Sequence, residues 1–338
     1  MFRIRSNFDI HVWFDSNINK EWQNLIPQDK FTSPYDLSEF ISSLTPWFCE
    51  IDKFTRHKTA SSKLIDIVCN KLSIKKSLEY DVLFHHITKL LHKDKQLFDL
   101  IGLPGSIPPK NIHRMQISPY WCGDFYSADL VLDVLNDCMI KILPEHHLLD
   151  LGCSSGSLTR IFNWLYPKTI FHGCDPVQDS IDWALSNLRG INFFRCQQEP
   201  PLELPDSSID GIIALSIWSH HSEHASKIWF SEMKRILKTG GWFLFTVHGM
   251  RSLYYYLSNI NKPIERWISV YEGLLQNNSV FEEIWITQDD VGNSSKDWGN
   301  FYVRPEWIIG ELVNDFEILL FKRGINQSNQ DVYLCRKL

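Results

Sequence analysis

The stretch "HHLLDLGCSSGSLTR", residues 146–160, decides the fold class of this chain. An apolar run ends in Asp150, turns through Gly152 and Gly156, and resumes with apolar residues at helical spacing. A buried strand, a glycine turn and a helix in this order are typical of the first cofactor-binding turn of a parallel sheet.

On both sides of this turn the chain alternates between strand and helix patterns. The predicted strands are apolar runs at residues 147–152, 169–175, 191–196, 209–218 and 242–249. The predicted helices between them cover residues 157–166, 179–188 and 223–237, the second with an Asp near its start as a cap candidate. "KTGG" (238–241) is predicted to end the last of these helices. This alternation predicts an α/β fold, a mostly parallel sheet with helices on both faces.

The last two apolar segments differ from the rest. Residues 316–324 and 331–338 read as strands with only a short connection between them. A short connection joins antiparallel strands, so we expect an antiparallel pair at one edge of the sheet.

Composition excludes several classes of protein. There is no apolar run long enough for a transmembrane helix, and the N-terminus does not resemble a secretory signal. The eight cysteines are scattered without a C-x-x-C pair, so we expect reduced thiols in a cytoplasmic protein and no zinc site. The net charge is −6, and the negative excess falls in residues 111–338. An acidic main domain is a poor match for a phosphate backbone, so no nucleic-acid partner is expected.

Two features divide the chain. "LIGLPGSIPPKN" (100–111) holds two Gly and three Pro, the strongest linker signal in the sequence. We therefore predict a mainly helical region over residues 1–110, serving as a lid, a substrate module or a partner module, and a catalytic domain over residues 111–338. Residues 249–303 are too many, at about 55, for a simple connection and predict an insertion on the acceptor side.

The glycine turn excludes two common nucleotide motifs. A dinucleotide fingerprint starting at Gly152 would need glycines where the chain has Ser154 and Ser157, and no Gly-Lys-Ser/Thr of a P-loop follows. Asp175 ends the second predicted strand, where a carboxylate can accept both hydroxyls of a ribose. A ribose without a pyrophosphate indicates a nucleoside cofactor, of which S-adenosylmethionine is the common one. Asp150 would then help to place the cofactor, directly or through water.

From about residue 118 to the C-terminus, these motifs closely resemble the class I S-adenosylmethionine-dependent methyltransferases. "LLDLGCSSG" resembles their first motif, although Ser154 stands where many members have Gly. "GCDP" resembles the second, with Asp175 as ribose ligand followed by Pro176. "RCQQEPPLELPDSSIDGIIAL" resembles the third region, which flanks the adenine; it contains Gln197, where an Asp is common, and ends at Leu215.

The resemblance implies a Rossmann-like seven-stranded sheet with an antiparallel last strand. It also implies S-adenosylmethionine as cofactor and S-adenosylhomocysteine as product. The cofactor-binding residues that follow from the two lines of reasoning are Asp150, Gly152, Ser154, Gly156, Asp175, Pro176, Gln197 and Leu215. "SIWSHHSEHASKIWFSEMKRILKTGG", "TVHG" and "NQDVYLCRKL" resemble methyltransferases of bacterial surface-polysaccharide biosynthesis, which would imply a sugar hydroxyl as acceptor.

Methyl transfer to a hydroxyl benefits from a base that removes the proton during attack. Such a base is expected after the fourth or fifth strand, and the first candidate is His220, which matches the His after this strand in the polysaccharide-linked enzymes. The second candidate is His248, in "TVHG". His220, His221 and His224 leave open a metal site, although no carboxylate stands at comparable spacing.

Aromatic residues of the predicted insertion suit either a sugar-stacking lid or the packing of an extra subdomain. They are Tyr254, Tyr255, Tyr256, Trp267, Tyr271, Trp285 and Trp298. A helix over 117–130 is predicted to close over the cofactor, with Tyr120, Trp121 and Tyr126 as candidate contacts.

The sequence therefore predicts a methyltransferase that acts on a small-molecule or glycan acceptor, with a hydroxyl as the favoured methylation site (O-methylation). An N- or C-methyltransferase of natural-product metabolism would share the cofactor site and differ in the acceptor pocket. A non-catalytic binding protein with the same fold, and a nicotinamide oxidoreductase, are the remaining alternatives.

Overall fold

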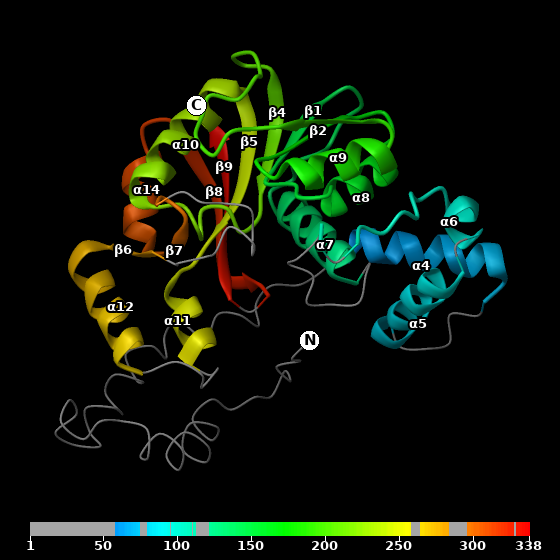
Figure 1. Cartoon of the computed structure of the whole chain (residues 1–338), viewed down its shortest axis with the longest axis horizontal. Helices are drawn as coiled ribbons and strands as arrows, with labels where there is room; N and C mark the ends of the chain where they lie inside the picture. Colours follow the sequence, from blue (N-terminus) through cyan, green and yellow to red (C-terminus); the bar gives the residue numbers. More distant parts are fainter. Residues whose placement is uncertain are drawn as a thin grey trace, which may run out of the picture.

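The computed structural model describes residues 58–74, 80–94, 96–109, 111–112, 122–257, 264–283, 296–327 and 329–338. Its centre is a seven-stranded sheet in the order β3-β2-β1-β4-β5-β9-β8 (Figure 1). The strands are β1 (His147–Leu151), β2 (Ile170–Asp175), β3 (Ile191–Arg195), β4 (Ile209–Ala214), β5 (Leu237–Val247), β8 (Phe316–Asn326) and β9 (Gln330–Lys337). β1 to β5 are parallel, and β9 is antiparallel to both of its neighbours. The predicted Rossmann-like sheet with an antiparallel last strand is confirmed.

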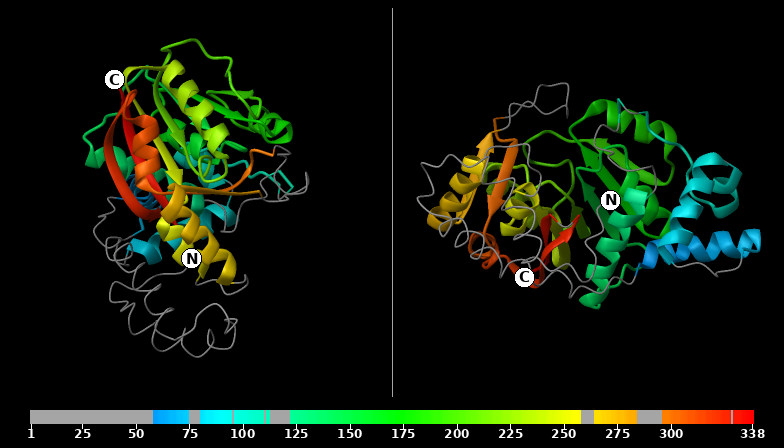
Figure 2. Two further views of the ribbon diagram at one scale, coloured as in Figure 1. Left: turned by 90° about the vertical axis from the view of Figure 1, so that its left-hand side faces the viewer. Right: turned by 90° about the horizontal axis from the view of Figure 1, so that it is seen from below.

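Helices cover both faces of this sheet (Figures 1 and 2). One face carries α7 (Cys122–Asp137), α8 (Ser157–Leu165) and α9 (Gln178–Asn187), and the other carries α10 (Glu223–Ile236) and α14 (Pro305–Leu312). Successive strand residues enter two separate hydrophobic clusters: Leu148 packs on the α7 side and Leu149 on the α10 side. Because side chains alternate across a strand, a continuous apolar run is what a sheet buried on both faces requires.

Three local predictions were wrong. "KTGG" does not end a helix: α10 passes directly into β5 at Leu237, and Gly240, with φ 79°, lies at an irregularity in the β4–β5 pairing. The fourth strand ends at Ala214, before the predicted residue 218, because the chain turns at Ser216 with φ 60°. The N-cap of α9 is Val177, so the Asp near the helix start does not cap it through its side chain.

The described part of the predicted N-terminal region is helical and packs on the sheet domain. It contains α4 (Thr59–Leu72), α5 (Tyr80–Lys93) and α6 (Gln96–Ile101), whose apolar residues join the cluster of α7 and α8. Asp129 on α7 accepts the backbone N–H of Ala60 at 2.7 Å and of Ser61 at 3.1 Å. Arg160 on α8 donates to the backbone oxygen of Ser106 at 2.7 Å and pairs with buried Asp124 at 2.5 Å. These contacts anchor residues 103–109 to the helix that follows the glycine turn.

The predicted insertion forms a small unit of its own. It contains α11 (Met250–Leu257), α12 (Ile264–Asn277), β6 (Ser279–Glu283) and β7 (Gly299–Val303), and β6 pairs antiparallel with β7. The unit lies at the opposite end of the molecule's long axis from α4, α5 and α6 (Figures 1 and 2). The seven-stranded sheet therefore has helices α4, α5 and α6 toward one end of the long axis and the α11–β7 unit toward the other.

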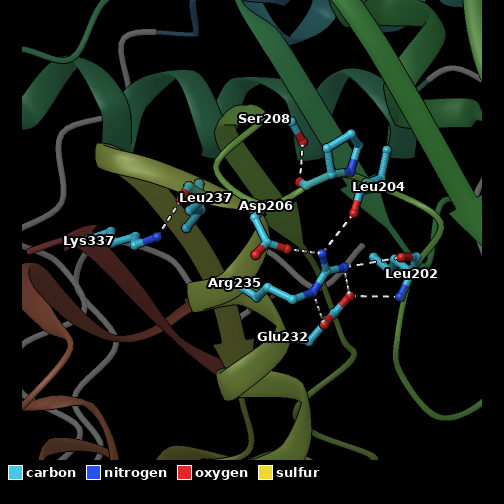
Figure 3. A network of polar contacts seen from close by, with 9 residues as sticks. Leu202, Leu204, Asp206, Ser208, Glu232, Arg235, Leu237 and Lys337 are labelled. Carbon is cyan, nitrogen blue, oxygen red and sulfur yellow. Dashed lines mark hydrogen bonds and ion pairs between the residues drawn. The ribbon is translucent and has the colours of Figure 1, made fainter.

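A polar clasp holds the connection between β3 and β4 (Figure 3). Buried Glu232 on α10 accepts from Arg235 and from the backbone N–H of Leu202 at 2.7 Å. Arg235 also donates to the backbone oxygens of Leu202 and Leu204 and to the carboxylate of Asp206. A guanidinium with five donors suits this task, since it ties several acceptors of one loop to a single helix.

Two further expectations concern membranes and thiols. Within the described ranges, no helix combines the length and the apolar character that crossing a membrane requires. In the same part of the chain Cys69, Cys138, Cys153, Cys174, Cys196 and Cys335 are free thiols.

Candidate active site

The glycine turn begins where β1 ends and requires its glycines for two reasons. Gly152 and Gly156 have φ values of 77° and 76°, in the left-handed region that side chains disfavour. A Cβ on Gly152 would also lie 2.2 Å from Cδ1 of Ile217, and one on Gly156 would lie 2.6 Å from the ring of Phe193. The turn therefore packs its backbone directly against side chains that follow β4 and lie within β3.

Ser154 has the same left-handed conformation, with φ 50°. This conformation costs a non-glycine residue on the order of 1 kcal/mol. The backbone N–H of Ser154 donates to Oδ2 of Asp175 at 2.8 Å, and a hydrogen bond to a buried carboxylate offsets a cost of that size. The Ser that departs from the family pattern is thus accommodated by the acid that ends β2.

Asp175 joins the glycine turn to the start of α9. Its Oδ1 accepts the backbone N–H of Val177 at 2.9 Å, and its side chain is 8% exposed. Burial raises the pKa of this carboxyl, while the two backbone hydrogen bonds oppose the shift. Each carboxylate oxygen has two lone pairs, so both oxygens can still accept a hydroxyl.

Asp150 is a second buried carboxyl at the same edge. Its Oδ2 accepts the hydroxyl of Thr159 at 2.5 Å. Burial raises the pKa of Asp150 to about 7, the Thr159 hydrogen bond opposes this, and the nearby charge of Asp175 adds to it. A cationic group that bound here would stabilise the carboxylate form of both residues.

The remaining predicted cofactor residues lie at the carboxyl ends of neighbouring strands. Pro176 follows Asp175, and its backbone oxygen accepts Nε of Arg195 at 3.1 Å. Gln197 follows β3 and is exposed, and Leu215 follows β4 and is half-buried. Since β1 to β4 are parallel, their carboxyl ends share one edge, and the predicted cofactor residues meet along it.

The three histidines after β4 do not converge. His220 is half-buried in the loop, His221 is buried with its ring stacked on Trp229, and His224 is exposed on α10. Burial lowers the pKa of His221 to about 3. Among the residues that the structure describes, no group of three metal-binding side chains occurs.

His220 is held by the insertion. Its Nδ1 lies 2.8 Å from the backbone oxygen of Gly299, the first residue of β7, and its ring stacks on Trp298 with centroids 5.1 Å apart. A carbonyl oxygen only accepts, so Nδ1 carries the proton and Nε2 keeps a basic lone pair. Burial lowers the pKa of His220, and the Gly299 hydrogen bond opposes the shift.

His248 follows β5 and is 1% exposed. Its ring stacks on Tyr302 and meets the ring of His220 edge-on, with centroids 5.6 Å apart. The hydroxyl of Tyr256 lies 3.4 Å from its Nε2. Burial lowers the pKa of His248 well below the usual value, so both candidate bases are neutral near pH 7.

Some aromatic residues of the insertion pack inside it, and Trp298 lies beside the candidate base His220. Trp267 is buried, with Tyr256 stacked on it, as the subdomain reading expects. Trp298 instead lies against His220. Tyr255 is exposed and Tyr271 half-buried. Trp285 and the side chain of Tyr254 lie outside the described residues.

The helix predicted before β1 is α7, which begins at Cys122. Tyr120 and Trp121 lie outside the described residues. The Tyr126 hydroxyl donates to the backbone oxygen of Ile325 at 3.1 Å and accepts the N–H of Gln327 at 2.8 Å. Tyr126 therefore ties α7 to the β8–β9 hairpin.

Sequence reasoning missed a polar group beside the histidines. It consists of Ser216, Ser219, Thr246, Asn326 and Gln330, joined by side-chain hydrogen bonds. The only signal was "NQD" at 329–331, a polar triplet at the start of an otherwise apolar strand.

Residues 148–241 match a protein-family model described as "Methyltransferase domain". Residues 148–241 are therefore similar to a methyltransferase domain. The chain is an enzyme of the methyltransferase class, and its cofactor is S-adenosylmethionine. No curated protein matches the chain in sequence.

Several solved structures align with the chain at low identity. A protein from Pyrococcus horikoshii is 16% identical, with 72% of this chain and 100% of that chain covered and a TM-score of 0.45. A SAM-dependent methyltransferase from Methanosarcina mazei is 16% identical, with coverages of 61% and 97% and a TM-score of 0.44. Magnesium protoporphyrin IX methyltransferase from Synechocystis, with bound SAH, is 14% identical, with coverages of 72% and 94% and a TM-score of 0.42.

Proposed function

We propose that this methyltransferase methylates a hydroxyl of a small or carbohydrate-type acceptor and that His220 is the general base. The observation that carries the proposal is the 2.8 Å contact between Nδ1 of His220 and the backbone oxygen of Gly299. This contact places a proton on Nδ1, so the neutral ring, which burial favours, keeps its free pair on Nε2. A neutral imidazole is the form that can accept the acceptor's proton near pH 7.

The residues of the β1–β4 edge fit the cofactor by their chemistry. Asp175 has lone pairs for two ribose hydroxyls, and the turn from Gly152 to Gly156, with Ser154 inside it, brings backbone close to the amino-acid end. Asp150 favours a nearby ammonium group, because its buried carboxyl loses its proton more readily beside a cation. Pro176, Gln197 and Leu215 flank the adenine, with the amide of Gln197 available to its amine.

When bound, S-adenosylmethionine supplies a methyl group on a sulfonium, which is already a good leaving group. The protein therefore has to align the acceptor oxygen with the methyl carbon and exclude water. The cofactor would supply the electrophilic methyl carbon and a neutral thioether as the leaving group, while the protein's residues hold the acceptor oxygen in line with that carbon. Nε2 of His220 takes the hydroxyl proton, which is later released to solvent.

We assign the acceptor side to the insertion, residues 249–303. β7 carries Gly299, and Trp298 presents a half-exposed ring beside His220. An aromatic face next to a base suits the apolar face of a sugar ring. We assign substrate or partner binding to residues 1–110, whose described helices α4, α5 and α6 pack on the sheet domain, and catalysis to residues 111–338.

A comparison of two histidine variants tests this function. The assay presents nucleotide-linked, lipid-linked and free sugars with S-adenosylmethionine and locates the added methyl group by mass spectrometry. His220→Ala should lower kcat about 10²- to 10⁴-fold on the best acceptor, because it removes the base. His224→Ala is the matched control, since His224 is exposed on α10, and should keep full activity.

Two outcomes would overturn the assignment. Full turnover by His220→Ala would favour an amine or carbon acceptor that needs no base from this position. Methylation of nitrogen or carbon in the best acceptor would contradict O-methylation directly.

A further inference from the structure

A buried amide joins the two loops that carry the histidines. Gln330 is the first residue of β9, and its side chain is 6% exposed. Because β9 is antiparallel to β5, with Val247 opposite Asp331, the start of β9 lies where β5 ends. The side-chain amide of Gln330 therefore lies beside the loops that follow β4 and β5, on the side proposed to bind the acceptor.

The orientation of this amide is fixed by three donors. Oε1 of Gln330 accepts the hydroxyl of Thr246 at 2.7 Å, the amide N–H of Asn326 at 2.8 Å and the hydroxyl of Ser216 at 2.9 Å. Nε2 must then face the other way, toward Ser219 Oγ at 3.2 Å and His248 Nε2 at 3.5 Å. An amide nitrogen only donates, so the ring nitrogen of His248 is the acceptor.

The same contacts hold a strained turn. Ser216 has φ 60°, in the region that costs a non-glycine residue about 1 kcal/mol or more. Thr246 accepts its backbone N–H at 2.7 Å, and Gln330 accepts its hydroxyl. Such a conformation persists only where its surroundings hold it in place. Ser216 begins the loop that ends at His220, and Ser219 directly precedes that histidine.

We propose that Gln330 is a positioning residue that holds the His220 loop and keeps His248 as a neutral hydrogen-bond acceptor. His248 then has its Nε2 lone pair engaged by Gln330 and Tyr256, whereas His220 has its Nδ1 engaged and its Nε2 available. Of the two histidines, only His220 exchanges a proton with the acceptor. The proposal rests on the proposed function in taking His220 as the base.

The other titratable groups that face His248 are also neutral near pH 7. They are the ring of His220 from the loop after β4, Tyr256 from α11 and Tyr302 from β7. Burial lowers the pKa of His220 and raises the pKa of both tyrosines. A negative charge introduced at position 330 should therefore raise the pKa of His248, because none of these three groups carries a charge that would oppose this effect.

Gln330→Glu supplies that charge in the full-length protein. The carboxylate loses the N–H donor and favours a protonated ring, so the pKa of His248 should rise by about 1–3 units. The measurement is an NMR titration of ¹³Cε1-labelled histidines, assigned with the spectra of His220→Ala and His248→Ala. Gln327→Glu is the matched control, since this exposed glutamine of the same hairpin should leave both histidines unchanged. Equal His248 titrations in the two Glu variants would overturn the proposal.

Gln330→Met is a second test of the proposal that does not introduce a charge. The side chain keeps a similar length but neither accepts from Ser216 nor donates to His248. The ¹⁵N shifts of His248 should then show loss of the Nδ1–H tautomer, while calorimetric affinity for S-adenosylhomocysteine stays within about twofold. An unchanged tautomer in the folded variant would contradict the proposal. Failure of His220 as base would appear instead in the activity of His220→Ala, which this titration does not use.

Discussion

The carboxyl ends of the parallel strands form one edge of the sheet, and its two halves, beside β1 and β2 and beside β4 and β5, differ in their contacts. The residues in contact are close in sequence in the first half and far apart in the second. Beside β1 and β2, the bonded pair Asp150 and Thr159 is 9 residues apart, and Ser154 and Asp175 are 21 apart. Beside β4 and β5, His220 meets Gly299 across 79 residues, and Ser216 meets Gln330 across 114. The half assigned to the cofactor is thus a local structure, whereas the half assigned to the acceptor depends on where distant segments pack.

The largest test of the local half is Asp175→Ala. The change removes the acceptor proposed for two ribose hydroxyls and the observed acceptor for the backbone N–H groups of Ser154 and Val177. With about 1.5 kcal/mol or more for each hydrogen bond to a charged group, affinity for S-adenosylhomocysteine should fall about 100-fold or more. Calorimetric titration measures this. Asp179→Ala, an exposed acid in the first turn of α9, should bind normally. Binding within fivefold of wild type in Asp175→Ala would remove Asp175 from the ribose site.

Gly152→Ala tests the contact between the glycine turn after β1 and Ile217 in the loop after β4. Gly152 and Gly240 have nearly equal φ values of 77° and 79°, but a Cβ on Gly240 meets nothing within 4 Å. Gly240→Ala should therefore cost about 1 kcal/mol of stability from backbone strain alone. Gly152→Ala should cost about 1–3 kcal/mol more, because its Cβ forces the Cδ1 end of the half-buried Ile217 side chain to move.

Urea unfolding of both glycine variants gives the comparison. Adding Ile217→Ala to Gly152→Ala should recover part of the excess loss, since it removes the atom that the new Cβ meets. An equal decrease in the free energy of unfolding for Gly152→Ala and Gly240→Ala would mean that the close contact with Ile217 does not add to the cost of a Cβ at position 152.

The same difference in separation explains what the sequence could predict. The order of strands and helices was predictable because each element carries its own periodicity, and the Asp150–Gly156 turn was predictable because its residues are adjacent. The end of β4 was missed because an apolar run continues past Ser216, and only the hydrogen bonds to Thr246 and Gln330 show why the chain turns there. No local pattern can place Gly299 against His220, because the two residues are 79 apart in the sequence and meet only through tertiary packing.

The pH dependence of cofactor binding is a smaller test of the local half. Asp150 has a pKa of about 7, raised by burial, so it is mostly protonated at pH 6 and mostly ionised at pH 8. A cofactor ammonium favours the ionised form, so affinity for S-adenosylhomocysteine should rise about tenfold from pH 6 to pH 8. Asp150→Asn cannot ionise and should give a flatter profile. A profile equally steep in that variant would assign the titration to another group.

Trp298→Leu should have the smallest effect, and it falls on the acceptor half alone. An aromatic contact contributes about 0.5–1.5 kcal/mol beyond burial, so loss of the ring beside His220 should raise the acceptor KM about fivefold. Trp298→Phe keeps a ring and should lie closer to wild type. Affinity for S-adenosylhomocysteine should not change in either variant, because the predicted cofactor residues lie at the ends of other strands. The His220 ¹³Cε1 resonance should also shift in Trp298→Leu, because the ring current of the stacked indole is lost. A change in cofactor affinity equal to the change in KM would show that the two halves are not separable at Trp298.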